Sequence, residues 1–164
     1  MPAPLLTVIV PSYNSQDYLD RAMTSLVGYG DEVEVIVVDD GSKDATGEIA
    51  DDWASRYDAV RVIHQENKGH GGAVNAGIAA ATGTHVRVVD SDDWLDRRAL
   101  AAVLDVLREE RAVGRDLDLL VTNYVYEKQG KAHKAVIRYR NVLPRDRVFG
   151  WAQVRRCRYD QYLM

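Results

Sequence analysis

Short apolar runs alternate along the chain with longer segments in which apolar residues recur every three or four positions. The runs are rich in valine and isoleucine, which is typical of buried strands, and they span residues 5–10, 33–40, 60–65, 85–90 and, more loosely, 117–127. The longer segments are typical of helices, and they span residues 19–26, 49–57, 72–81 and 100–107. This alternation predicts βαβ units in an α/β fold with a doubly wound, mostly parallel sheet flanked by helices.

Polar residues mark the expected ends of these elements. Pro11 is expected to end the first strand, because proline cannot donate to a sheet ladder. The expected helix caps are Asn14 or Ser15 for the first helix, Asp44 for the second, and Asp93 or Asp96 for the fourth. Residues 128–131 are expected to turn the chain into a hairpin with a return strand at 135–140, and residues 148–154 to form one more short helix.

Three polar motifs, PSYN, DDGS and DSDD, each follow a predicted strand. In doubly wound sheets ligands bind at the carboxyl ends of the strands, so these motifs are expected to meet at one edge. Asp90, Asp92 and Asp93 bring three carboxylates together, and Mg²⁺ or Mn²⁺ typically takes one or two carboxylates plus phosphate oxygens. Helix capping and solvation explain one of these acids but not three, which favours a metal or ribose contact.

The other two motifs offer groups for a nucleoside. Tyr13 can stack on a base, although a tyrosine packed over a helix cap is an equally good interpretation of PSYN alone. Asp39 and Asp40 can accept hydrogen bonds from a base or a ribose, and turn formation by the residues that follow leaves both unexplained.

The segment ENKGHGGAVNAG is rich in glycine and opens a helix, so its backbone N–H groups can face a phosphate. It lacks the GK[ST] ending of a Walker loop and the position of a dinucleotide fingerprint. Lys68, His70 and Asn75 are the side chains in it that best suit an anion or a sugar.

Length, composition and charge indicate the number of domains, the cellular compartment and the kind of partner. A length of 164 residues suits one domain, and the single Cys157 favours a reducing cytoplasm. No window approaches the roughly 20 apolar residues of a membrane span. Residues 131–164 carry nine Lys or Arg and two Asp, a net charge of +7. Residues 1–130 carry 12 Lys or Arg and 23 Asp or Glu, a net charge of −11. The basic end suggests contact with an anionic partner such as a phosphate or a lipid headgroup, or it is a solvated face.

Together, TVIVPSYN, VIVVDDGSKDAT, NKGHGGAVNAGIAAATG and VRVVDSDDWL resemble the family 2 glycosyltransferases with the Rossmann-like GT-A fold, over residues 5–110. The resemblance implies a nucleotide-diphosphate sugar donor with uridine as the expected base, a divalent metal (Mn²⁺ or Mg²⁺), and transfer with inversion. It also implies site roles: Pro11 and Tyr13 at the base, Asp40 at the base or ribose with Asp39 supporting it, Lys68, Gly72 and Asn75 near the donor, Asp92 at ribose or metal, and Asp90 or Asp93 completing the metal site.

Beyond residue 117 the sequence departs from the pattern of this family. None of Asp118, Glu127, Asp146 and Asp160 stands in the acidic setting expected for the general base, so we expect that base beyond Met164 and leave the catalytic residue unassigned. We therefore expect a single GT-A-type domain over residues 1–164, truncated at its C-terminus, with a donor-binding half at 5–115 and an incomplete start of the acceptor side at 116–164.

The expected function is metal-dependent transfer of a sugar to a glycan or lipid-linked acceptor, in polysaccharide or cell-surface glycan synthesis. We expect a cytoplasmic protein without a nucleic-acid partner, with peripheral contact to the inner membrane face through the basic end. One alternative is a non-catalytic nucleotide-sugar-binding module. Another is a nucleotidyltransferase, which would favour a basic, glycine-rich loop where PSYNSQDYL stands.

Overall fold

The computed structural model describes residues 2–115, 117–127, 134–139, 143–144, 147–150 and 153. The chain divides into two compact units, Met1–Asp116 and Leu117–Met164. PSYN, DDGS, the glycine-rich segment and DSDD all lie in the first unit.

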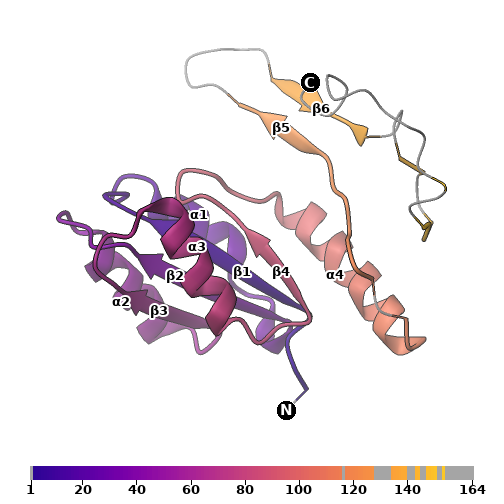
Figure 1. Cartoon of the computed structure of the whole chain (residues 1–164), viewed down its shortest axis with the longest axis horizontal. Coiled ribbons are helices and arrows are strands. Elements are labelled where there is room, and N and C mark those ends of the chain that lie inside the picture. The colour runs from indigo at the N-terminus through magenta and orange to yellow at the C-terminus, as the bar shows by residue number, and fades with distance from the viewer. Residues whose placement is uncertain are drawn as a thin grey trace. The chain divides into compact units, whose positions relative to one another are not determined.

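A parallel four-stranded sheet forms the centre of the first unit (Figure 1). Its strands lie in the order β3-β2-β1-β4, with bounds Val60–His64, Val33–Asp39, Leu6–Ser12 and His85–Val88. Every residue of β1 and β2 is buried, which is the burial on both faces that their largely apolar sequences predict. The predicted parallel α/β sheet is confirmed.

Helices cover both faces of this sheet. They are α1 (Leu19–Leu26), α2 (Thr46–Arg56), α3 (Gly69–Ala80) and α4 (Arg97–Ala112), with a 3₁₀ turn at Gly30–Glu32. In the view of Figure 1, α3 lies in front of the sheet, and α1 and α2 lie behind it. On the α3 side, Ile9, Ile36 and Val38 of the sheet pack with Ala73 of the helix. Gly77 allows this close approach, because a Cβ there would lie 2.3 Å from Cγ2 of Ile9.

The sequence predicted that Pro11 ends β1, but the strand continues to Ser12. Pro11 instead limits the length of β4. Alternate residues of a strand bond to the same neighbour, and the carbonyl of Ile9 accepts from the N–H of Val89 on the β4 side. The next donor on that side would be the nitrogen of Pro11, which carries no hydrogen. Pairing between β1 and β4 therefore stops, while β1 continues along β2 as far as Ser12 opposite Asp39. The residues after Val88 are thereby free to form a loop.

The predicted helix ends are partly right. Asp96 caps α4, accepting from the N–H of Ala99. Asp44 is wrong as the cap of α2, because the N-cap position is Ala45 without a side-chain cap bond, although Asp44 does accept from the N–H of Thr46 nearby. Asn14 and Ser15 are wrong as side-chain caps of α1, because its N-cap position is Tyr18 and no side chain bonds there. The third helix begins at Gly69, which has a left-handed φ of 75°, rather than at residue 72, so the expected start was wrong.

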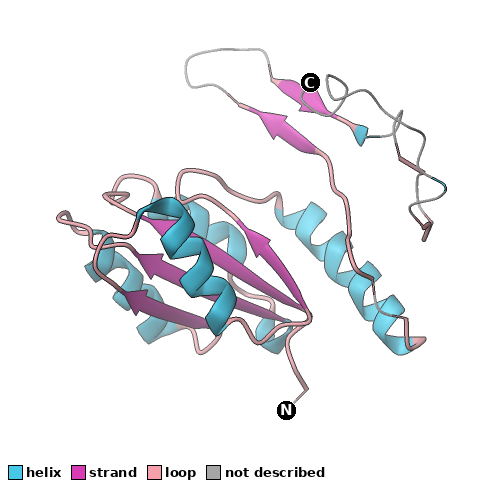
Figure 2. Ribbon diagram, viewed as in Figure 1, coloured by secondary structure: helices cyan, strands magenta, loops and turns pink. Residues whose placement is uncertain are grey.

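The second unit contains a two-stranded antiparallel sheet of β5 (Tyr124–Tyr126) and β6 (Ala135–Ile137), shown as two magenta arrows in Figure 2. The predicted hairpin pairing is thus confirmed, with a fifth strand much shorter than 117–127. Its turn and most of the helix expected at 148–154 lie outside the described residues. Within the described part of the chain, no helix has the length and apolar character needed to cross a membrane.

Candidate functional site

The strand order places a topological switch point between β1 and β4. The chain runs from β1 outward through β2 to β3 and then returns to β4 on the other side of β1. In such sheets a crevice opens at the carboxyl ends of the two strands where the direction changes. PSYN spans the end of β1 and the loop after it, and DSDD follows β4, so these two motifs lie at the switch point, with DDGS beside them at the end of β2.

The loop after β1 presents an aromatic ring to solvent. Tyr13 is 48% exposed, whereas Pro11 before it is buried in the strand. Asn14 has a left-handed φ of 49°, and it is held on both sides: its N–H donates to Oγ of Ser42 (3.0 Å), and its Oδ1 accepts from the N–H of Lys43 (2.9 Å). PSYN and DDGS therefore form one hydrogen-bonded surface with the tyrosine standing on it.

Asp40 is 3% exposed and holds the loop that follows β3. Its Oδ1 accepts from Nε2 of Gln65 (2.6 Å) and from the N–H of Lys68 (2.8 Å). Burial alone would raise the pKa of Asp40, but the bonds from Gln65 and from the backbone of Lys68 and Gly69 outweigh it and lower the pKa of this carboxyl. The carboxylate is therefore an ionised structural anchor, a role that the sequence did not reveal.

Asp39 is 7% exposed and closes the turn at the end of β2. Its Oδ1 accepts from the N–H of Ser42 (3.0 Å), and its Oδ2 lies 3.1 Å from Nδ1 of His64. Burial opposes ionisation, yet the bonds from Ser42 and His64 lower the pKa of Asp39. Gly41 has a φ of 73°, and a Cβ there would lie 3.0 Å from the backbone nitrogen of Asn67. This position in the turn therefore favours glycine over any residue with a side chain.

The three carboxylates of DSDD gather in the loop after β4. The N–H of Asp93 donates to the carbonyl of Asp90 (2.9 Å), and Oγ of Ser91 lies 2.7 Å from Oγ of Ser15, which ties this loop to the residue that follows PSYN. Burial, followed by the charges of Asp92 and Asp90, raises the pKa of Asp93. The acids are therefore close enough to repel one another, and a cation would relieve that repulsion.

The start of α3 lies beside this loop. Nδ1 of His70 is 3.8 Å from Oδ1 of Asp90, and both side chains are more than half exposed. Lys68 precedes the helix and Asn75 lies one turn further along it, both exposed. Gly72 packs closely against the side chain of Lys68. A Cβ added at Gly72 would lie only 2.5 Å from the Cβ of Lys68. The contact between His70 and Asp90 thus places the start of α3 beside the acidic loop.

The donor set suits a hard divalent cation. Carboxylate oxygens are the ligands that Mg²⁺ and Mn²⁺ prefer, and these ions usually complete their shell with water and phosphate oxygens. Among the residues that the structure describes, no group of three or more His, Cys, Asp or Glu side chains is arranged to hold a metal ion by itself. Asp90, Asp92 and Asp93 fit a site in which one or two carboxylates share the ion with a bound phosphate.

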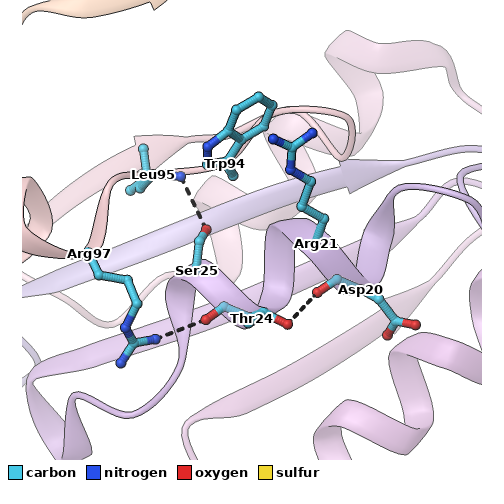
Figure 3. A pocket seen from close by; sticks show the side chains of 7 residues that line it. All are labelled: Asp20, Arg21, Thr24, Ser25, Trp94, Leu95 and Arg97. Atoms are coloured by element: carbon cyan, nitrogen blue, oxygen red, sulfur yellow. Dashed lines mark hydrogen bonds between the residues drawn. The ribbon is translucent and has the colours of Figure 1, made fainter. Parts of the chain in front are cut away.

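An open hollow of about 490 Å³ lies next to the acidic loop, between α1 and the start of α4. Figure 3 shows Arg21 reaching toward Trp94, and the guanidinium carbon lies 3.2 Å from the ring centroid. The N–H of Leu95 donates to Oγ of Ser25 (3.1 Å), and Arg97 donates to the carbonyl of Thr24 (2.9 Å). These contacts pin the residues that follow DSDD against α1.

Comparison with known proteins gives a family match over nearly the whole chain, and it is the family that the sequence motifs resemble. The family model for glycosyl transferase family 2 matches residues 7–156. The chain is 37% identical over 122 residues to the glycosyltransferase GlyG of Streptococcus pneumoniae, covering 73% of this chain and 39% of GlyG. It spans 33% to 39% of the length of GlyG and of two Bacillus subtilis glycosyltransferases, EpsH and EpsJ.

Two solved structures share the fold. The structure of S. aureus TarS 1-349 in complex with UDP is 32% identical with a TM-score of 0.59, covering 65% of this chain and 32% of that chain. The mannosyltransferase PcManGT from Pyrobaculum calidifontis, in complex with GDP-Man and Mn²⁺, is 32% identical with a TM-score of 0.55, covering 63% of this chain and 32% of that chain.

Proposed function

We propose a function for this chain from the premise that it belongs to glycosyl transferase family 2. It forms the donor-binding part of an inverting glycosyltransferase that transfers a sugar from a nucleotide-diphosphate sugar to a glycan or lipid-linked acceptor. Uridine is the proposed base. The observation that carries the proposal is the meeting of PSYN, DDGS, DSDD and the start of α3 at the switch point of a parallel sheet.

Each part of the site has a proposed role in holding the donor. Tyr13 stacks on the base above Pro11, on a loop fixed by its bonds to DDGS. Asp40 and Asp39 keep that surface in shape and offer carboxylate oxygens to the base or ribose. Lys68, Gly72 and Asn75 line the side of the site at which the diphosphate would lie.

The acidic loop is the proposed metal site. Asp92 binds the metal or the ribose, and Asp90 or Asp93 completes the site, with the exposed carboxylates facing solvent and the donor. The metal, when bound, neutralises charge on the leaving nucleotide diphosphate. The general base that takes the acceptor proton is proposed to lie outside the donor-site residues named here.

The comparisons support this assignment at the level of class. TarS has been solved with UDP, and the mannosyltransferase PcManGT with GDP-Man and Mn²⁺. Both complexes support a nucleotide donor, and the second also supports a divalent cation. Because the two nucleotides differ in base, the choice of uridine rests on the resemblance of the motifs. The acceptor, its polysaccharide or cell-surface setting and any contact with a membrane are likewise proposals.

Nucleotide titration tests the proposal. UDP, GDP and TDP are each titrated into the chain by calorimetry in the presence of Mn²⁺. We expect saturable binding that is tightest for UDP, and we expect Asp58→Ala, at the opposite end of the sheet from the site, to leave it unchanged. Binding led by GDP or TDP would correct the base. Absence of binding for all three nucleotides would contradict the donor-site assignment.

A further inference from the structure

His64, the last residue of β3, lies between two carboxylates. Its Nδ1 is 3.1 Å from Oδ2 of Asp39 at the end of β2, and its Nε2 is 3.0 Å from Oδ1 of Asp51 on α2. Both distances are within hydrogen-bonding range. The ring is about half exposed, whereas the carboxylate of Asp39 is almost entirely buried. One ring thus connects a surface helix to a buried acid of the proposed donor site.

The two contacts together require a particular protonation state. An ionised carboxylate only accepts hydrogen bonds, and a neutral imidazole carries a single N–H. Only the imidazolium donates to both acids at once. Its bonds to Asp39 and Asp51 raise the pKa of His64, against the opposing effect of burial. The charged groups that face the ring are Asp39 from β2 and Asp51 from α2.

The connection continues into the loops at the switch point. Oδ1 of Asp39 accepts from the N–H of Ser42, and Oγ of Ser42 accepts from the N–H of Asn14, the neighbour of Tyr13. A continuous series of hydrogen bonds therefore runs from α2 through the imidazole to the loop that carries the exposed tyrosine. Loss of either bond at the ring would leave Asp39 less firmly fixed.

We propose that His64 is a positioning residue of the donor site: its imidazolium, held by Asp51, fixes Asp39 and through it the DDGS and PSYN loops, so that nucleotide-sugar affinity falls when the ring loses its proton. This inference rests on the proposed function, because it assigns the loops to nucleotide binding. His64 itself is not expected to touch the donor.

The direction of the pH effect follows from the raised pKa of His64. The ring is fully protonated below its ordinary value of about 6.5, and the stabilising link is then fully present. The link is lost as pH rises through the higher pKa of the folded chain. Affinity for the donor is therefore highest at mildly acid pH and declines toward alkaline pH.

Calorimetry with a UDP-sugar tests this, since its diphosphate, unlike the terminal phosphate of UDP, does not titrate in this range. Binding to the full chain is measured with Mg²⁺ from pH 6 to 8.5. We expect affinity to fall on the order of fivefold across the range, the effect of about one charge-assisted hydrogen bond. His64→Gln should bind weakly at every pH. Asp51→Asn should move the decline to lower pH.

The matched control is Asp52→Asn, which removes a carboxylate from the next position of α2, where it pairs with Arg56 instead. It should behave as the parent chain. In parallel, NMR titration of the His64 ring without ligand should show a pKa that is lowered by Asp51→Asn and not by Asp52→Asn. This readout reports on the ring whether or not a nucleotide binds.

The outcomes separate the two proposals. Parent-like affinity and pH dependence in His64→Gln would overturn the role of His64 and leave the proposed function intact. An unchanged His64 pKa in Asp51→Asn would overturn the part assigned to Asp51. No binding of the UDP-sugar at any pH, with the NMR titration as expected, would contradict the donor site itself and with it the positioning role.

Discussion

Asp40 is a buried anion that is stabilised chiefly by hydrogen bonds. Gln65 and the N–H of Lys68 both donate to its Oδ1. Asp40→Ala leaves these donors without their acceptor, and we expect the free energy of unfolding to fall by roughly 2 kcal/mol. Urea denaturation measures this. Asp52→Ala removes an exposed carboxylate and should cost less than about 1 kcal/mol. A similar loss in both variants would contradict the anchoring role of Asp40.

The same carboxyl contributes to the acid limit of stability. The pKa of Asp40 is lowered in the folded chain, so its stabilising contribution is present above the unfolded value of about 3.9 and is lost as pH falls through the lower folded value. The difference in unfolding free energy between the parent chain and Asp40→Ala should therefore shrink below about pH 4. Urea denaturation at a series of pH values checks this, and a constant difference down to pH 2 would refute it.

The pKa of Asp93 is raised rather than lowered, because its carboxyl is partly desolvated and is also close to the charges of Asp92 and Asp90. Asp93→Asn removes one of three neighbouring charges. We expect it to stabilise the metal-free chain at pH 7 by up to about 1 kcal/mol while weakening metal-dependent UDP binding. Thermal unfolding in EDTA measures the first effect, with Asp58→Asn as the control. A destabilised Asp93→Asn would show that this carboxylate supports the loop.

At the scale of elements, α3 depends on two kinds of glycine. A Cβ at Gly77 would lie 2.3 Å from Ile9, whereas a Cβ at Gly71 in the same helix would meet nothing within 4 Å. Gly77→Ala should push the helix from the sheet and cost about 1–3 kcal/mol. Gly71→Ala should be neutral or stabilise by up to about 1 kcal/mol. Urea denaturation of both variants tests this, and equal effects would contradict the packing argument.

The elements of the first unit follow closely from the sequence, because each of its strands is a short run rich in valine and isoleucine and each amphipathic helix has an apolar stripe. The misjudged ends have local physical causes. Pro11 was expected to break β1, but its missing N–H falls on the β4 side of the strand, so it shortens β4 instead. The glycines before residue 72 read as a loop, yet α3 begins at Gly69.

The placement of the motifs at one edge was also predictable, since parallel strands all end on the same side of the sheet. The side-chain partners were not. His64 is 25 positions from Asp39, and Ser15 is 76 positions from Ser91, and no periodicity links residues so far apart. Nothing in the sequence singles out His64, because Asp39 reaches it only when β2 pairs with β3, and Asp51 only when α2 packs beside β3.

At the scale of the whole molecule, all proposed donor-site residues lie in the first compact unit, Met1–Asp116. Residues 1–116 alone should therefore keep metal-dependent UDP affinity within about twofold of the 164-residue chain. Calorimetry on both chains makes the comparison, and circular dichroism confirms that the shorter chain is folded. A folded but non-binding 1–116 chain would show that residues beyond 116 contribute to the donor site.

The most direct test of the account is the metal dependence of UDP binding at DSDD. UDP is titrated into the 164-residue chain with Mn²⁺, with EDTA, and with Mn²⁺ after Asp92→Ala. The account predicts saturable binding with Mn²⁺ that weakens at least about tenfold in EDTA and in the variant. Equal affinity under all three conditions would contradict a metal-assisted donor site at the end of β4.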